Sequence, residues 1–404
     1  MLKNRQIKYD NHFTIKIGYD IINTIPKRRT NMEKIFDAHV HYSFGLPIEE
    51  MVRIFRKEFE DLNTEKMVFV SVPTHAQDYQ ITFDSAHNVK GLFLKKAFSP
   101  NAYAYAGLEH PDYEISDAER SALYLKQAQE YYAAGYDGMK MLEGQPDIRR
   151  ALKIALDSPV YDAYYSFLEE KGIPVTMHIA NPEPFWEEAY DDTFASKEQI
   201  TKEMFGIMQK HPKLKLTLAH FGFMSYDIQQ AEAFMQYENT VFDLTPGGEQ
   251  LIEMRKSWPQ WQAFFEKYQN RIIYGTDQYA FPDDDATTWK ISYHRRPDFV
   301  QRFLETDDEF VYAAKTDTTI KGVKLDKSIL NRIYRENLIA LLGEPRKIDE
   351  EYLKRKAEEL LKNLPENETF PEKDDGYKIV PSEREKRLKK YQENMRYIIK
   401  YLND

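Results

Sequence analysis

The sequence predicts an α/β protein: a closed (β/α)8 (TIM) barrel with a short N-terminal β extension and a C-terminal helical extension. Eight short apolar runs recur along the chain, and each is followed by a longer segment with helical periodicity. Alternating strands and helices build parallel sheets, and eight such units favour closure into a barrel. The predicted strands are Ile35–His41, Lys66–Pro73, Ala102–Leu108, Tyr136–Leu142, Pro174–Ala180, Leu214–His220, Thr240–Pro246 and Ile272–Asp277.

The segments between these runs carry the signals of helices that end at glycine. Ser121–Ala134 has apolar residues at helical spacing and is followed by Gly135. Tyr161–Lys171 is followed in the same way by Gly172. Glycine directly after a helical pattern is typical of a helix C-terminus. Ile329–Leu342, which also precedes a glycine, is predicted to be the last barrel helix.

Two regions lie outside the predicted barrel, which spans residues 33–344. The N-terminal extension, residues 1–32, contains the alternating segment His12–Tyr19, a strand signal. The C-terminal extension, residues 345–404, is predicted to hold two charged helices, and the second has an apolar stripe. This stripe predicts docking on the barrel or on a second subunit, which would form a homo-oligomer. The stripe consists of Leu388, Tyr391, Met395, Ile398 and Leu402.

Composition excludes several classes of function. The 404-residue chain has no cysteine, which removes disulfides, thiolate catalysis and cysteine-type zinc sites. Its formal net charge is −10, so we expect no general affinity for nucleic acid or anionic membranes. The N-terminal residues carry charges throughout, and no apolar run approaches the roughly 18 residues of a membrane span. We therefore expect a soluble cytoplasmic protein.

Residue types that commonly bind metal ions, histidine and aspartate, end four of the predicted strands. His39 and His41 lie two residues apart at the end of the first strand, so both side chains point to the same face and can coordinate one cation. His178 ends the fifth strand, His220 the sixth and Asp277 the eighth. Any one of them could be a hydrogen-bonded core residue. Five at corresponding strand ends favour a shared metal site, since burying such groups otherwise costs several kcal/mol.

Lys140 is a sixth unusual residue, near the end of the fourth predicted strand and between two methionines. A lysine in a buried strand must be paired, desolvated or chemically modified. Alternatively, its side chain extends to solvent at the mouth of the barrel.

The ordered set resembles the amidohydrolase superfamily, which carries His-x-His, Lys, His, His and Asp on strands one, four, five, six and eight. Residues 37–41 (DAHVH), 218–222 (LAHFG) and 275–277 (GTD) resemble most closely the amidohydrolase-2 (amidohydrolase-related) family. The resemblance covers about residues 33–343. It implies a metal-dependent barrel enzyme, in a family that includes decarboxylases, lactonases and hydrolases of small carboxylated substrates.

The resemblance also implies roles for individual residues. His39, His41, His178 and Asp277 would be metal ligands, and His220 would bind a second metal or polarise the substrate. Lys140 matches the lysine that in some binuclear members becomes a carbamate bridging two metals. The implied cofactor is one or two divalent ions, with zinc expected first and manganese, iron or nickel as alternatives.

The expected activity is hydrolysis of a C–N or C–O bond of a small, carboxylated substrate by a metal-activated water. Asp277 would act as general base and then acid, and His220 would stabilise the developing oxyanion. Lys140 is the third catalytic candidate. A metal-dependent non-oxidative decarboxylase or hydratase is the alternative on the same site. A non-catalytic barrel that retained its ligands is a third hypothesis.

Substrate contacts are expected from the loops that follow the strands. Arg295 lies in the long segment 283–326 after the eighth strand, where its planar fork could bind a substrate carboxylate. Each candidate has a structural alternative as a packed or solvated side chain. The strand-end candidates are Tyr42, His75, His110, Glu143, Asn181, Phe221, Thr245 and Tyr279.

Overall fold

The structure is a computed structural model, in which residues 34–404 form one compact unit. The strand predicted in His12–Tyr19 and the predicted substrate contact Arg295 lie outside the described residues. Those residues are 34–42, 46–77, 80–83, 86–111, 113–188, 190–245, 248–279, 297, 299–311, 319–363, 373–374, 377–378 and 381–404.

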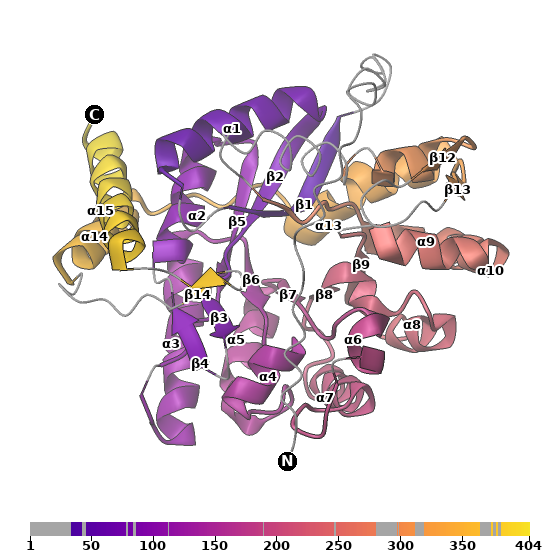
Figure 1. Cartoon of the computed structure of the whole chain (residues 1–404), viewed down its shortest axis with the longest axis horizontal. Coiled ribbons are helices and arrows are strands. Elements are labelled where there is room, and N and C mark those ends of the chain that lie inside the picture. Colours follow the sequence, from indigo (N-terminus) through magenta and orange to yellow (C-terminus); the bar gives the residue numbers. More distant parts are fainter. Residues whose placement is uncertain are drawn as a thin grey trace. The chain divides into compact units, whose positions relative to one another are not determined.

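The predicted parallel barrel is confirmed, and all eight predicted runs contain a strand. Neighbouring strands pair in sequence order, as expected for consecutive βα units. Figure 1 shows the strands at the centre of the described part, with helices outside them. The strands are β1 (Ile35–His41), β2 (Thr64–Val70), β5 (Ala102–Gly107), β6 (Gly138–Met141), β7 (Val175–Met177), β8 (Leu216–Leu218), β9 (Thr240–Asp243) and β10 (Ile272–Ile273).

The ring closes through the eighth strand, which is split in two. β10 pairs with β9, and β11 (Gln278–Tyr279), a few residues further on, pairs with β1. Between them the Asp277 amide donates to the His39 carbonyl at 2.8 Å. The predicted eighth strand therefore continues past Asp277, which lies at a kink with φ of 53°.

Helices cover the outside of the ring, and their ends follow local sequence signals. Ser116 caps the helix at 117–134 in a capping box with Glu119. Gly135 and Gly172 end their helices in the left-handed conformation, as predicted. The helices are α1 (Ile48–Asp61), α2 (Ala86–Ala97), α3 (Asp117–Ala134), α4 (Pro146–Leu152), α5 (Asp162–Lys171), α6 (Glu183–Glu188), α7 (Lys197–Lys210), α8 (Ile228–Phe234), α9 (Gly248–Lys256), α10 (Trp258–Lys267), α12 (Lys327–Asn331), α13 (Asn337–Leu342), α14 (Glu350–Asn363) and α15 (Pro381–Asn403).

In the part of the chain that the structure describes, three antiparallel hairpins lie outside the ring, and they were not predicted from the sequence. They are β3–β4 (Thr74–Gln77 and Gln80–Phe83), β12–β13 (Glu309–Val311 and Thr319–Lys321) and β14–β15 (Lys373–Asp374 and Tyr377–Lys378).

Strand β1 shows how the fold presents its polar residues. All of it is buried. Phe36 and Ala38 pack in a hydrophobic cluster with Leu338 of the outer helix α13. Because side chains alternate along a strand, His39 and His41 point to the opposite face, into the barrel. The apolar residues thus pack against helices, and the histidines line the interior.

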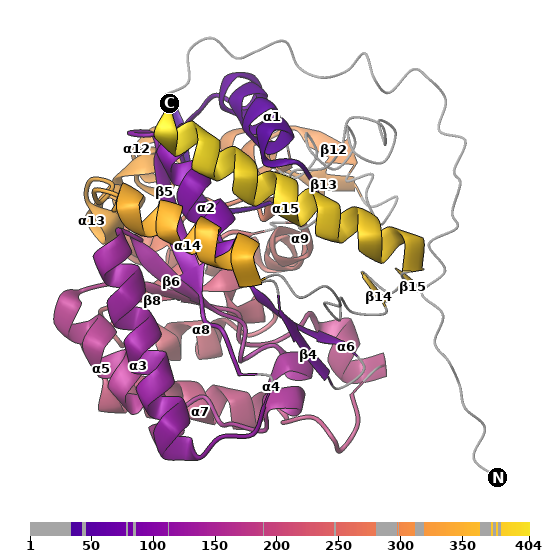
Figure 2. The ribbon, with the colours of Figure 1, turned by 90° about the vertical axis from the view of Figure 1, so that its left-hand side faces the viewer.

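The C-terminal helices dock on the barrel domain rather than extending away from it. Figure 2 shows α15 running past α14, α2 and α1. On α15, Met395 and Ile398 are fully buried, so the predicted apolar stripe does pack inward. Asn394, also on α15, accepts a hydrogen bond from the Ile48 amide at the start of α1. Within the described residues, no helix is long and apolar enough to cross a membrane.

Candidate metal centre

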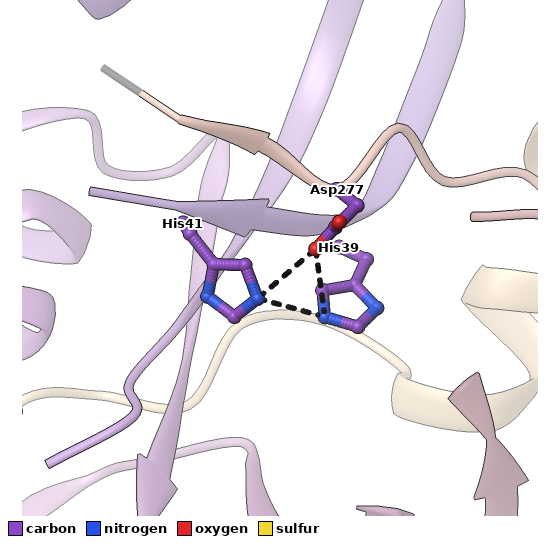
Figure 3. Close-up of side chains that lie close together, drawn as sticks. All are labelled: His39, His41 and Asp277. Atoms are coloured by element: carbon purple, nitrogen blue, oxygen red, sulfur yellow. Dashed lines mark hydrogen bonds and ion pairs between the residues drawn. The ribbon is translucent and has the colours of Figure 1, made fainter. Parts of the chain in front are cut away.

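Three side chains from the two strands that close the barrel form a tight group (Figure 3). The Nε2 atoms of His39 and His41 lie 3.1 Å apart. Oδ1 of Asp277 lies 3.2 Å from His41 Nε2 and 3.9 Å from His39 Nε2. Both imidazoles are buried, whereas the Asp277 side chain is 15% exposed. The group therefore sits where a small ion could enter.

The hydrogen-bond partners of the two rings determine which nitrogen carries the proton. His39 Nδ1 lies 2.9 Å from Oδ2 of Asp243, and His41 Nδ1 lies 2.9 Å from the Val70 carbonyl. Carboxylate and carbonyl oxygens only accept, so each Nδ1 must donate and each Nε2 keeps a lone pair. Burial also lowers the pKa of His39 well below its usual value, which keeps the ring neutral.

These assignments leave only acceptor atoms facing one another. Nε2 of His39, Nε2 of His41 and the Asp277 carboxylate cannot donate to each other. Their close approach is unfavourable unless a positive charge lies close to them, such as a bound cation or the Lys140 ammonium, whose Nζ lies 3.3 Å from His39 Nε2. Neutral imidazoles that carry the lone pair on Nε2, together with a carboxylate, are a ligand set for divalent transition metals. The residues present therefore fit a divalent cation.

His178 and His220 form an adjoining pair. His220 Nε2 lies 3.1 Å from His178 Nδ1, and the His220 ring centroid is 5.6 Å from that of His39. His220 Nδ1 lies 3.2 Å from the Thr245 carbonyl, so Nδ1 donates and Nε2 accepts from His178. His178 Nε2 is then a buried acceptor with no hydrogen-bond partner among the described residues. Burial lowers the pKa of His220 to about 4 and that of His178 well below its usual value.

Lys140 completes the set of six predicted residues. Its Nζ lies 3.3 Å from His39 Nε2, and the residue is only 2% exposed, so the side chain does not extend to solvent. Burial lowers the pKa of Lys140 to about 8, and the nearby Asp243 and Asp277 carboxylates oppose that shift. The structure thus brings residues on β1 and β6, and residues that follow β7, β8 and β10, to one end of the barrel.

Backbone strain is concentrated at two of these positions. After β8, the left-handed region holds His220 at φ 59° and the next three residues, through Phe223, at φ 53–57°. Asp277 is left-handed as well. Such conformations cost roughly 1–3 kcal/mol for each non-glycine residue and persist only where surrounding contacts impose them. Their presence at two predicted ligands indicates a backbone shaped for a site.

Two of the predicted substrate contacts form a buried chain of hydrogen bonds. His110 Nε2 lies 2.7 Å from Oε1 of Glu143, and His110 Nδ1 lies 2.6 Å from the hydroxyl of Tyr124 on α3. His110 follows β5 and Glu143 follows β6, so both sit at the carboxyl ends of neighbouring strands. Glu143 Oε2 has no hydrogen-bond partner among the described residues.

The remaining candidates lie in different surroundings. Tyr42 packs in a hydrophobic cluster, and its hydroxyl contacts Ser71 Oγ and the His87 carbonyl. Phe221 is likewise fully buried against other aromatic rings. His75 lies on β3, Asn181 follows β7, Thr245 follows β9, and Tyr279 lies on β11.

Sequence reasoning missed two buried aspartates that hold the site together. Asp37 accepts from the His39 amide at 3.1 Å and from the Thr276 hydroxyl at 2.6 Å, and burial raises its pKa to about 7. Asp243 binds His39, as described above. The sequence did contain a signal for Asp243, because it is a carboxylate near the end of an apolar run, like the residues that were selected.

A closed (β/α)8 barrel with these groups at its strand ends defines a metal-dependent barrel enzyme acting on small molecules. The chain belongs to the amidohydrolase (Amidohydro_2) family, whose model matches residues 113–343. The matched segment contains Lys140, His178, His220 and Asp277, and begins after β1, β2 and β5. A comparison with curated proteins gave no match.

Several solved structures are similar in fold. An amidohydrolase II is 16% identical, with a TM-score of 0.47, covering 77% of this chain and 100% of its own. The 4-oxalomesaconate hydratase of Rhodopseudomonas palustris is 14% identical, with a TM-score of 0.46 and coverage of 76% and 95%. A 2,6-dihydroxybenzoate decarboxylase bound to 2,6-dihydroxybenzoate is 15% identical, with a TM-score of 0.47 and coverage of 77% and 99%.

Proposed function

We propose that this chain is a metal-dependent hydrolase that cleaves a C–N or C–O bond of a small, carboxylated substrate. The observation that carries the proposal is the convergence of His39 Nε2, His41 Nε2 and Asp277 Oδ1, three acceptors that cannot donate to one another. His178 is the proposed fourth ligand, because its buried Nε2 has no hydrogen-bond partner in the described part of the chain. Zinc is the proposed ion, since it suits three imidazoles and one carboxylate.

Each residue then has a chemical task. A divalent cation in this position supplies a water of lowered pKa and polarises a carbonyl group. The partly exposed Asp277 carboxylate would accept a proton from water and return it to the leaving group. His220 donates from Nδ1 to Thr245, so its Nε2 carries a lone pair, which accepts from His178. Released from that hydrogen bond, Nε2 would act as a proton acceptor or second-metal ligand rather than as an oxyanion donor. Lys140 would act through its buried Nζ, as an ammonium or as a carbamate.

Substrate recognition is proposed for the residues at the neighbouring strand ends. Glu143 and His110 offer a buried carboxylate and an imidazole beside β6, the strand that carries Lys140. Asn181, four residues beyond the end of β7, offers a side-chain amide. Arg295 remains the proposed partner of the substrate carboxylate.

Metal analysis combined with turnover of a panel of lactones, amides and aromatic carboxylates tests this function. We expect at least one zinc ion per chain. A chelator should abolish hydrolysis, and added zinc should restore it.

His41→Ala should lose the metal, whereas His211→Ala, which removes a buried histidine at the end of α7, should keep it. Release of CO2, or hydration, without hydrolysis would favour the decarboxylase or hydratase alternative. Full metal occupancy without any turnover would favour the non-catalytic barrel.

A further inference from the structure

Asp243, at the end of β9, joins parts of the site that are far apart in the sequence. The residue is 1% exposed. Its Oδ2 lies 2.9 Å from His39 Nδ1 on β1. Its Oδ1 accepts from the His220 amide at 2.7 Å and from the Thr245 hydroxyl at 2.7 Å. One buried carboxylate therefore contacts two predicted metal-site histidines, one on β1 and one after β8.

The contact with His39 determines what that ring can offer to a cation. Because a carboxylate only accepts, Asp243 holds the ring proton on Nδ1 and leaves the lone pair on Nε2. That lone pair faces His41 and Asp277. A negative partner on Nδ1 also raises the basicity of the ring, as carboxylates behind zinc-bound histidines do.

The contacts with His220 and Thr245 act on the backbone. The His220 amide is the first in a run of left-handed residues after β8, and its hydrogen bond to Asp243 is among the contacts that hold this strained turn. The Thr245 hydroxyl donates to Asp243, so its oxygen can accept from His220 Nδ1, 3.1 Å away. The same carboxylate thus orients the ring of His220 through Thr245.

We propose that Asp243 is the positioning residue of the metal centre: it sets the tautomer and direction of His39 and, at the same time, anchors the turn that carries His220. This inference rests on the proposed function, because it requires that His39 binds a cation. Asp243 itself does not touch the cation. Its carboxylate acts through the two histidines.

Asp243→Asn tests the proposal with Zn²⁺ and Co²⁺ as probes. The amide has nearly the same shape but no charge, and its NH2 group can turn toward His39 and move the ring proton to Nε2. We expect the affinity for Zn²⁺, measured by competition with a chelator, to fall about 10- to 100-fold. The visible absorption spectrum of the Co²⁺-loaded variant should also differ from that of the wild type. Unchanged affinity and an unchanged spectrum would overturn the proposal.

Glu203→Gln is the matched control. Glu203 on α7 is also 1% exposed and accepts hydrogen bonds from Arg149 and the Leu156 amide, outside the site. We expect it to lower stability but to leave Zn²⁺ affinity unchanged. An equal loss of affinity in both variants would mean that Asp243 matters only for folding, and would overturn its positioning role.

A second measurement does not depend on the folding of a variant. Long-range ¹H–¹⁵N spectra of the Zn²⁺-loaded wild type with labelled histidine should show His39 protonated on Nδ1 and bound to the metal through Nε2. A proton on Nε2, or a metal bond through Nδ1, would refute the inference. Failure of the wild type to bind Zn²⁺ or Co²⁺ would instead refute the proposed function, which separates the two.

Discussion

Glu58 gives the prediction with the most direct physical basis. It lies on α1 with no exposed surface, and neither carboxyl oxygen has a hydrogen-bond partner among the described residues. Burial, followed by the charges of Asp37 and Asp61, raises its pKa well above the usual value of 4.5. The folded protein therefore keeps a proton on Glu58 at a pH where the unfolded chain has lost it.

The sign and size of the effect follow from this difference. Because folding raises the pKa, the contribution to stability is complete below pH 4.5 and is lost as the pH rises toward the folded pKa. The loss is about 1.4 kcal/mol per pH unit within that interval. Glu58→Gln cannot ionise. The free energy of unfolding of this variant should therefore not decrease with pH through Glu58 ionisation. At neutral pH it should exceed that of the wild type.

Urea unfolding followed by circular dichroism at several pH values, with a chelator present, measures the difference. Other titrating groups contribute equally to both proteins and largely cancel when the two profiles are subtracted. Glu358→Gln, which removes an exposed carboxylate of α14, is the control and should give the wild-type profile. Parallel profiles for wild type and Glu58→Gln would refute the reasoning, since they would mean that Glu58 has an ordinary pKa in the folded protein.

Three further substitutions test the site and the C-terminal docking. His178→Ala should sharply lower the metal bound per chain, measured by elemental analysis; wild-type stoichiometry would remove this ligand from the scheme. Asp277→Asn should lower kcat about 10²- to 10⁴-fold with a smaller change in KM, because an amide cannot take the proton. A loss confined to KM would contradict the general-base role. Asn394→Ala should lower the free energy of unfolding by about 1–3 kcal/mol, because the amide of Ile48 and the carbonyl of Leu46 lose their partner. Unchanged unfolding in urea would show that this contact does not hold α15.

The strands and most of the site could be predicted because their signals are local. Apolar runs such as Ile35–His41 follow from the need to bury both faces of a barrel strand, and this run has the same bounds in the structure. The position of a residue at the end of a strand can also be read from the local sequence. In a parallel barrel all strand ends meet at one face, so His178, His220 and Asp277 could be placed together without coordinates.

Side-chain direction was not predictable from position along the chain. Tyr42 also follows a strand, yet it stacks on His87 at 4.3 Å between ring centroids, inside the core. Packing against α2, which is distant in sequence, decided this. The apolar stripe of α15 likewise left its docking partner open until Met395 and Ile398 were found buried within the same chain.

The amino-acid sequence by itself determined the barrel, its order of strands and the set of residues that meet at its mouth. Only the tertiary structure decided how those residues are held. Nothing local in Ala219–Phe223 specifies consecutive left-handed residues, since that conformation is unfavourable for histidine and phenylalanine. It requires partners from elsewhere, and Asp243 is one of them. Hydrogen bonds between distant strands fix both the strained backbone and the ring protons, and such bonds exist only once the barrel has closed.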